Sequence, residues 1–163
     1  MSTDQPAQRE ELLHAFRRVG RRLSNATVMF HQAVAGRLEM NLTDYKVLGI
    51  LADTGPVTAG RLAEITGLTT GAVTGIVDRL ERTGHVRRGR DPGDRRKVII
   101  EPVWPPEHEE AVGGVFAALM GAAAEDVAEY SDRDLALVLE FMDRHARTLQ
   151  RLTGELRKTG GAP

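Results

Sequence analysis

The sequence predicts a mainly helical protein with one small β-ribbon near the middle of the chain. Apolar residues recur every three or four positions in two long segments, Leu12–Leu38 and Leu135–Leu156, as in amphipathic helices. Between them, the turn-forming sequence Asp91–Asp94 separates two segments with strand character, Val86–Arg90 and Arg95–Glu101. We therefore expect a long N-terminal helix, a compact middle domain and a pair of C-terminal helices, with boundaries at residues 1–41, 42–104 and 105–163.

The composition excludes several classes of protein. The chain has 163 residues, no cysteine and a formal net charge of −1. Without cysteine it cannot hold disulfides, iron–sulfur clusters or thiolate zinc sites, nor sense oxidants through a thiol. Residues 1–11 are polar, and the longest uncharged run, Ala111–Ala124, is shorter than the ~20 residues that span a bilayer. We expect a cytoplasmic protein with no membrane segment and no cofactor.

Capping residues predict the helices of the middle domain. Thr43 followed by Asp44 marks the start of one helix, which ends at the Asp53–Pro56 turn sequence. Thr58 caps a short helix, Ala59–Thr66, that Gly67 terminates. A third helix starts with Thr69 or Thr70 as its cap and ends near Gly84.

The C-terminal part is expected to contain two helices. Prolines 102, 105 and 106 mark a linker, and acidic residues then begin a helix that runs to about Tyr130. The sequence Ser131–Asp134 resembles a capping box at the start of the last helix. We expect Lys158–Pro163 to be a frayed tail.

Positive charge is concentrated in the middle domain. Residues 58–100 carry nine basic and five acidic side chains, a net +4, which leaves −5 on the rest of the chain. Within that segment, residues 85–97 alone carry six basic and two acidic side chains. A basic middle between acidic flanks suits a module that binds a polyanion on a scaffold, although a solvated charged loop has the same composition.

The helix after Thr69 has one apolar and one unusual outer face. Its apolar residues lie at helical spacing and face the core. The opposite face carries small, hydroxyl and charged residues, including a mid-helix Gly75 that costs ~1 kcal/mol relative to alanine. In a helix that enters the DNA major groove, such a glycine lets the backbone come close to the bases. The alternative explanation is that another helix packs against this face. The outer face consists of Gly71, Thr74, Gly75, Asp78, Arg79 and Arg82.

The arginines of the ribbon suit phosphate contact and insertion into a narrow minor groove, where the negative potential is deepest. The acids Asp91 and Asp94 would repel DNA if they were unpaired, so we expect at least one of them to hold a neighbouring arginine in position. Charges on an exposed ribbon also prevent edge-to-edge pairing, and both roles can hold together. A short helix, a tight turn, a second helix and a ribbon together predict a winged helix-turn-helix.

These residues resemble the MarR (multiple antibiotic resistance regulator) family of winged-helix transcription factors. The matching motifs are Leu68–Thr74, Val77–Gly84, Arg87–Arg88 and Asp91–Arg96, within residues 42–101. The resemblance implies a homodimer on a palindromic operator, most often a repressor, with residues 1–41 and 105–163 as dimerisation helices. It also implies that each recognition helix enters a major groove and each wing a minor groove.

The residues predicted to contact DNA come from the outer face of the helix after Thr69, from the ribbon and from the family motif. The resemblance assigns a phosphate contact to Thr58 and a minor-groove contact to Arg95. Two departures from the family pattern are Gly75, where many members carry a polar or basic side chain, and the Ile100–Val103 sequence after the wing. The predicted set is Thr58, Thr69, Thr70, Gly71, Thr74, Arg79, Arg90, Arg95 and Arg96.

Many members of the family release DNA when a small aromatic or phenolic effector binds between the dimer helices and the winged domain. The resemblance therefore implies an effector cleft, for which plain core packing is the alternative explanation of each residue. By position, the candidate lining residues are Phe30, His31, Val34, Tyr45, Leu48 and Trp104.

Three other functions remain open from the sequence alone. A metal-responsive regulator of the same fold would use scattered histidines, but none of them has helical ligand spacing. An enzyme is not indicated, because no phosphate-binding loop, nucleophile motif or carboxylate pair is present. A dimeric protein-interaction module without DNA affinity predicts no salt-dependent binding to a duplex. The five histidines are His14, His31, His85, His108 and His145.

Overall fold

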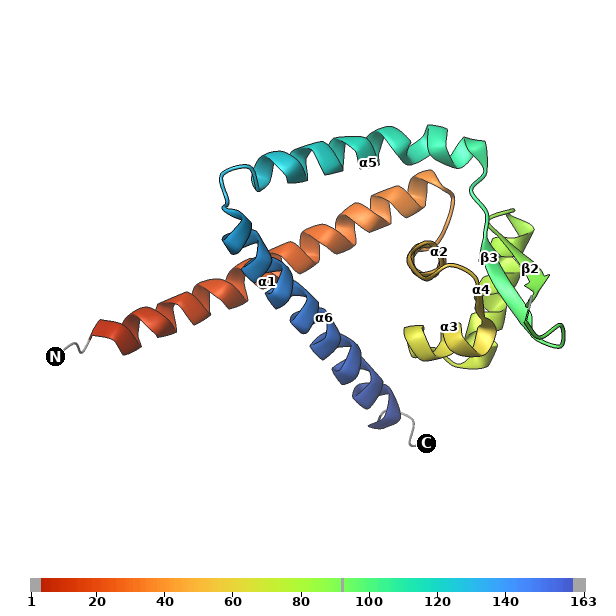
Figure 1. The fold of residues 1–163 in the computed structure, drawn as a ribbon, viewed down its shortest axis with the longest axis horizontal. Helices are drawn as coiled ribbons and strands as arrows, with labels where there is room; N and C mark the ends of the chain where they lie inside the picture. The colour runs from red at the N-terminus through yellow and green to blue at the C-terminus, as the bar shows by residue number, and fades with distance from the viewer. Residues whose placement is uncertain (1–3, 92, 160–163) are drawn as a thin grey trace.

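The structure, a computed structural model, describes residues 4–91 and 93–159. Most of these residues are helical and the strands form one small sheet, as predicted (Figure 1). Within the described ranges, no helix combines the length and apolarity needed to cross a lipid bilayer. The elements are α1 (Asp4–Arg37), α2 (Leu42–Thr54), β1 (Val57–Thr58), α3 (Ala59–Thr66), α4 (Thr70–Arg82), β2 (Val86–Arg90), β3 (Val98–Pro102), α5 (Pro106–Asp126) and α6 (Asp132–Thr159).

The middle domain is built around one apolar core between α2, α3, α4 and the sheet. Each of these helices contributes an apolar row at helical spacing, and the strands close the core from the other side. The predicted core row of α4 is fully buried. The buried cluster consists of Val47, Leu48, Leu51, Leu62, Val73, Ile76, Val77, Leu80, Val86 and Ile100.

Side-chain caps fix the ends of α3 and α4. The Thr58 hydroxyl oxygen accepts a hydrogen bond from the Arg61 N–H at 3.2 Å, and the Thr69 hydroxyl oxygen accepts one from the Ala72 N–H at 3.2 Å. The earlier of the two candidate threonines is therefore the cap of α4. Gly67 ends α3 with a left-handed φ of 64°, which a residue with a side chain rarely adopts. The predicted cap and stop of α3 are both confirmed.

The start of α2 differs from the prediction. Asn41, not Thr43, is the cap, and its side-chain oxygen accepts a hydrogen bond from the Asp44 N–H at 2.9 Å. Asn and Thr are both good caps, and the apolar Leu42 between them joins the helix because its side chain is half-buried. The helix ends at Gly55, as predicted.

The ribbon is part of a three-stranded antiparallel sheet in the order β1-β3-β2. Strand β1, which was not predicted, pairs Val57 with Ile100. The predicted strand Arg95–Glu101 is wrong at both ends, because residues 95–97 form the turn and β3 runs to Pro102. Pro102 pairs opposite Val86 instead of beginning the linker. Below, the wing means β2, β3 and the loop between them, residues 86–102.

The long helices extend away from this domain (Figure 1). Helix α6 crosses α1, where the rings of Phe16 and Phe141 meet edge to face with centroids 5.3 Å apart. Many large apolar side chains on both helices are exposed in the single chain. The stripes predicted from periodicity therefore remain unburied within the part of the protein that the structure describes.

The ends of the C-terminal helices differ slightly from the prediction. Helix α5 ends at Asp126 rather than near Tyr130. The Ser131 hydroxyl oxygen accepts a hydrogen bond from the Asp134 N–H at 3.2 Å, so the predicted cap is confirmed. The Ser131 hydroxyl in turn donates to the Asp134 carboxylate at 2.6 Å, in place of the reciprocal bond of a capping box. Residues 158 and 159 continue α6, and the rest of the predicted tail lies outside the described residues.

Leu62→Ala is expected to destabilise the middle domain, because the Leu62 side chain is 0% exposed at the centre of its core. Removing a buried leucine costs about 2–5 kcal/mol through lost burial and the cavity left behind. Val98→Ala, at a wing position that is 50% exposed, is the matched control and should cost less than about 1 kcal/mol. Urea denaturation followed by circular dichroism measures both, and equal costs would contradict this assignment of the core.

Candidate nucleic-acid interface

The outer face of α4 is bare. Its glycines have no close neighbours: a Cβ added at Gly71 meets nothing within 4 Å, and one added at Gly75 meets only the Arg79 Nη1 at 3.6 Å. No other helix of the described chain packs there, so the alternative explanation for these glycines receives no support within this chain. The backbone of α4 is open to close approach by a large partner.

The threonine hydroxyl groups around this bare face differ in their hydrogen bonds: two accept one from the backbone and one donates one. Thr58 and Thr69 use their oxygens as helix caps, so each hydroxyl hydrogen remains available to donate to a phosphate. Thr74 donates its hydroxyl hydrogen to the Thr70 carbonyl at 2.9 Å and retains a methyl group and acceptor lone pairs. The first two therefore suit phosphate contact, and Thr74 suits contact with a base edge.

Arg79 is anchored by a buried carboxylate. Its Nε and Nη2 donate to the two oxygens of Asp44 at 2.8 and 2.7 Å, and the Asp44 side chain is only 7% exposed. The hydrogen bond that Arg79 donates to Asp44 raises the pKa of Arg79, so the guanidinium remains charged. This pair joins α4 to α2 and leaves the Arg79 Nη1 beside Gly75 on the outer face.

A second ion-pair network joins the wing to α4. The Arg88 guanidinium on β2 contacts Asp78 at 2.5 Å and also contacts Glu81, while the Arg88 backbone N–H donates to Glu81 at 3.2 Å. The hydrogen bond to Asp78 is the main cause of the raised pKa of Arg88. This role of Arg88 was not predicted from the sequence. The signal available was the pair of acids three residues apart on α4, at the spacing of one helix turn.

Both acids of the wing loop accept hydrogen bonds, and its three arginines, Arg90, Arg95 and Arg96, are exposed. Asp94 holds Arg96, with its Oδ1 3.3 Å from the Arg96 Nε, which confirms that at least one wing acid positions an arginine. Asp91 accepts hydrogen bonds from the backbone N–H groups of Gly93 and Asp94 at 2.7 and 3.0 Å, which closes the turn. Arg90 donates to the Arg95 carbonyl at 2.9 Å. Across residues 4–91 and 93–159, no carboxylate pairs with the Arg95 side chain.

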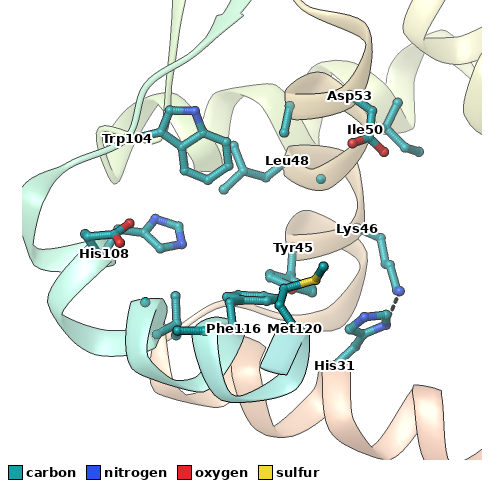
Figure 2. A pocket seen from close by; sticks show the side chains of 16 residues that line it. His31, Tyr45, Lys46, Leu48, Ile50, Asp53, Trp104, His108, Phe116 and Met120 are labelled. Atoms are coloured by element: carbon teal, nitrogen blue, oxygen red, sulfur yellow. Dashed lines mark hydrogen bonds between the residues drawn. The ribbon is translucent and has the colours of Figure 1, made fainter. Parts of the chain in front are cut away.

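A cavity of about 880 Å³ lies between α2, α5 and the linker (Figure 2). Four of the six residues expected to line an effector cleft lie in its wall: His31, Tyr45, Leu48 and Trp104. The other two do not line it. Val34 is buried, and the Phe30 ring packs on the lining residue Phe116 with centroids 6.2 Å apart. Further lining residues that the sequence did not indicate include Lys46, His108, Phe116 and Met120.

The cavity has apolar walls and two polar sides. On one side the Lys46 ammonium donates to His31 Nδ1, and on the opposite side the His108 ring faces the cavity (Figure 2). Burial is the main cause of the lowered pKa of His31 and lowers that of Lys46, and burial raises the pKa of Tyr45. In the described chain, no three side chains of His, Asp or Glu come together as a metal site.

Comparison with known proteins places this geometry in a family. The model of the MarR family matches residues 38–97, which include α2 to α4 and most of the wing. A relative from Bacillus subtilis (strain 168), named uncharacterized HTH-type transcriptional regulator YcgE, is 39% identical over 142 residues, which are 87% of this chain and 91% of that protein. The chain belongs to the MarR family. It is thus a DNA-binding transcriptional regulator and not an enzyme, as the sequence predicted.

Two further similarities support this assignment. The HTH-type transcriptional repressor NicR of Pseudomonas putida is 33% identical over 92 residues, 56% of each protein. The solved structure of a MarR family protein from Bacillus stearothermophilus superposes with a TM-score of 0.62 at 19% identity and covers 86% of this chain and 96% of that one. The latter similarity shows that the winged helix with long flanking helices is the common fold of this MarR protein and its structural neighbour.

Arg79→Ala is expected to destabilise the protein by about 2–3 kcal/mol, because it leaves the buried Asp44 carboxylate without its partner. Arg82→Ala, one turn further on the exposed face, should change stability by less than about 0.5 kcal/mol. Urea denaturation measures both. The double variant Asp44→Ala with Arg79→Ala should be more stable than Arg79→Ala alone, and the opposite order would contradict the anchoring role.

Proposed function

We propose that this MarR protein is a homodimeric repressor that reads a palindromic operator with α4 in the major groove and the wing in the minor groove. The bare face of α4 is the observation that carries the proposal. It combines two glycines that no other element of the described chain covers, threonine hydroxyl groups with unused hydrogen-bonding capacity, and arginines beside a basic wing. The name of NicR, a transcriptional repressor, supports the direction of regulation. Such a regulator works on the nucleoid in the cytoplasm.

The proposed dimer uses the helices outside the middle domain. Residues 1–41 and 105–163 form the dimerisation part in this proposal, and residues 42–104 form the DNA-binding domain. Support comes from the exposed apolar side chains of α1 and α6, which a single soluble chain would not leave uncovered. Twofold symmetry then presents two α4 helices to half-sites one turn of DNA, ~34 Å, apart. These side chains include Leu12, Phe16, Val19, Leu23, Leu149, Leu152 and Leu156.

The proposed contacts divide into three kinds. Hydroxyl groups and helix N-termini contact phosphates, the outer face of α4 reads base edges, and Arg95 enters the minor groove. Arg79 contributes only its Nη1, since the rest of its guanidinium is bound by Asp44. Arg90 and Arg96 shape the wing loop and add positive charge. The full proposed set is Thr58, Thr69, Thr70, Gly71, Thr74, Arg79, Arg90, Arg95 and Arg96.

The cavity supports release by a small aromatic or phenolic effector. Its volume of about 880 Å³ is in the range of small-molecule sites, and its walls are largely apolar with polar groups on opposite sides. It lies between the middle domain and α5, so an occupant changes the angle between the DNA-binding domain and the dimerisation helices. A change in the spacing of the two α4 helices then mismatches the fixed spacing of the grooves.

Arg95→Ala is expected to weaken operator binding about tenfold and to make the affinity less dependent on salt. One lost positive charge per protomer at the DNA reduces the slope of log affinity against log salt by about two per dimer. The operator is first obtained by selection from a pool of random duplexes, and fluorescence anisotropy then measures affinity at several salt concentrations. Arg144→Ala, which breaks an exposed pair with Glu140 on α6, is the matched control.

The same titrations decide between a DNA-binding regulator and a protein-interaction module. The regulator predicts two chains per bound duplex by analytical ultracentrifugation and a steep loss of affinity with salt. A lone monomer, or no duplex recovered from the selection at low salt, would contradict the proposal.

Filling the cavity is expected to abolish effector release while leaving DNA binding intact. Ala117 lines the cavity from α5, so Ala117→Phe should remove the response to any phenolic compound that weakens operator binding of the wild type. Ala122→Phe on the same helix, outside the cavity lining, is the control. Isothermal titration calorimetry with a set of phenolic compounds provides the measurement, and a set that never weakens operator affinity counts against this mechanism.

A further inference from the structure

His108 lies in a buried position at the junction between the wing and α5. The residue is 6% exposed, and its Nδ1 is buried without a hydrogen-bond partner in the described chain. Its ring meets the ring of His85 edge to face with centroids 4.9 Å apart, and meets Trp104 at 5.4 Å. Buried polar atoms are normally satisfied, so an unpaired imidazole nitrogen in such a place calls for an explanation.

The same junction holds both elements of the proposed DNA interface. His85 lies between the end of α4 and the start of β2, and its Nδ1 is 2.9 Å from the Thr83 hydroxyl oxygen. Its carbonyl accepts a hydrogen bond from the Val103 N–H at 2.8 Å, where the chain leaves the wing. A displacement of the His108 ring therefore moves the base of the wing and the end of α4 together.

The surroundings of His108 disfavour a charge on its ring. His108 is in the first turn of α5, at the positive end of the helix dipole. Burial lowers the pKa of His108, which the neighbouring Glu109 opposes, and burial together with His108 lowers the pKa of His85. Two charged imidazoles in edge contact would also repel one another.

Other charged and titratable groups face the junction from the remaining elements. Near the end of α1 they are Arg37 and Glu39, on α5 itself they are Glu107 and Glu109, and on the cavity side they are His31, Tyr45, Lys46 and Asp53. None of them makes a hydrogen bond or ion pair with His108 in the described chain.

We propose that His108 is a positioning residue for the wing, and that proton uptake by its ring loosens the junction and releases DNA as the pH falls. This inference rests on the proposed function as a DNA-binding dimer. The closed junction holds the neutral ring, whereas an opened, hydrated ring takes up a proton near the ordinary pKa of 6.5. The neutral ring therefore contributes its full stabilising free energy to the closed junction above that pH, and this contribution is lost as the pH falls below it.

The expected direction of the change in DNA affinity distinguishes this effect from the general attraction between positive charge and DNA. Acidification adds positive charge to exposed histidines, which by itself strengthens binding to a polyanion. A loss of affinity on acidification therefore requires a specific structural cause.

The test measures affinity for the selected operator duplex by fluorescence anisotropy at constant salt, from about pH 8 to about pH 5.5. The wild-type protein is expected to lose about fivefold or more in affinity across this range. His108→Gln keeps a neutral polar side chain at every pH, so it should bind with a flat profile. The matched control His14→Gln should retain the wild-type profile.

A direct titration of the imidazoles by NMR accompanies the binding measurements. The His108 signal is expected to titrate below its ordinary value, because the ring is buried. In His108→Gln the His85 signal should move upward, because the neighbouring ring that lowers the pKa of His85 is gone. If His108→Gln does not fold, as judged by circular dichroism, His85→Gln supplies the binding test and should lose less affinity on acidification than the wild type.

Different outcomes would contradict the role of His108 and the proposed DNA-binding function. Wild-type affinity that stays constant or rises on acidification overturns the role of His108, as does an equal loss of affinity in His108→Gln or a His108 ring that titrates at or above its ordinary value. Failure of the wild type to bind any duplex at pH 8 instead overturns the proposed function, and this inference with it.

Discussion

Four apolar side chains of α4, Val73, Ile76, Val77 and Leu80, bury one face of that helix against α2, α3 and the sheet. Because the helix period places them on one side, the residues between them must point outward. The glycines and threonines of the outer face are therefore presented by a rigid core rather than by a loop. The Asp44–Arg79 pair and the Arg88 network then fix the rotation of α4 from both sides.

Local signals were sufficient to predict most of this fold. The Thr58 cap, the Gly67 stop and the core row of α4 each depend on residues within one or two turns, so the sequence alone located them. The two-residue strand β1 could not be found in this way. It exists only because Val57 and Thr58 lie opposite β3, and that pairing joins positions about forty residues apart. The pairing of β2 with β3 is also tertiary in origin: it places Pro102 opposite Val86 and so extends the wing beyond its predicted end.

The site was harder to predict than the fold, because its decisive contacts are tertiary. The sequence placed Arg79 on the outer face but gave no sign that Asp44, on another helix, would hold it. In the cavity, residues were chosen by position along α1 and α2, and of these His31 and Tyr45 line it. Phe30 is next to His31 in sequence but its ring packs on Phe116, and most of the missed lining belongs to α5.

The first turn of α5 lies between the cavity and the base of the wing. The His108 ring lines the cavity and also meets the ring of His85. In the proposed mechanism, an effector in the cavity and a proton on the ring therefore act on the same element, and each changes the free energy that the other must supply. Because coupling free energies are reciprocal, DNA that holds the junction closed would in turn weaken both effector binding and proton uptake.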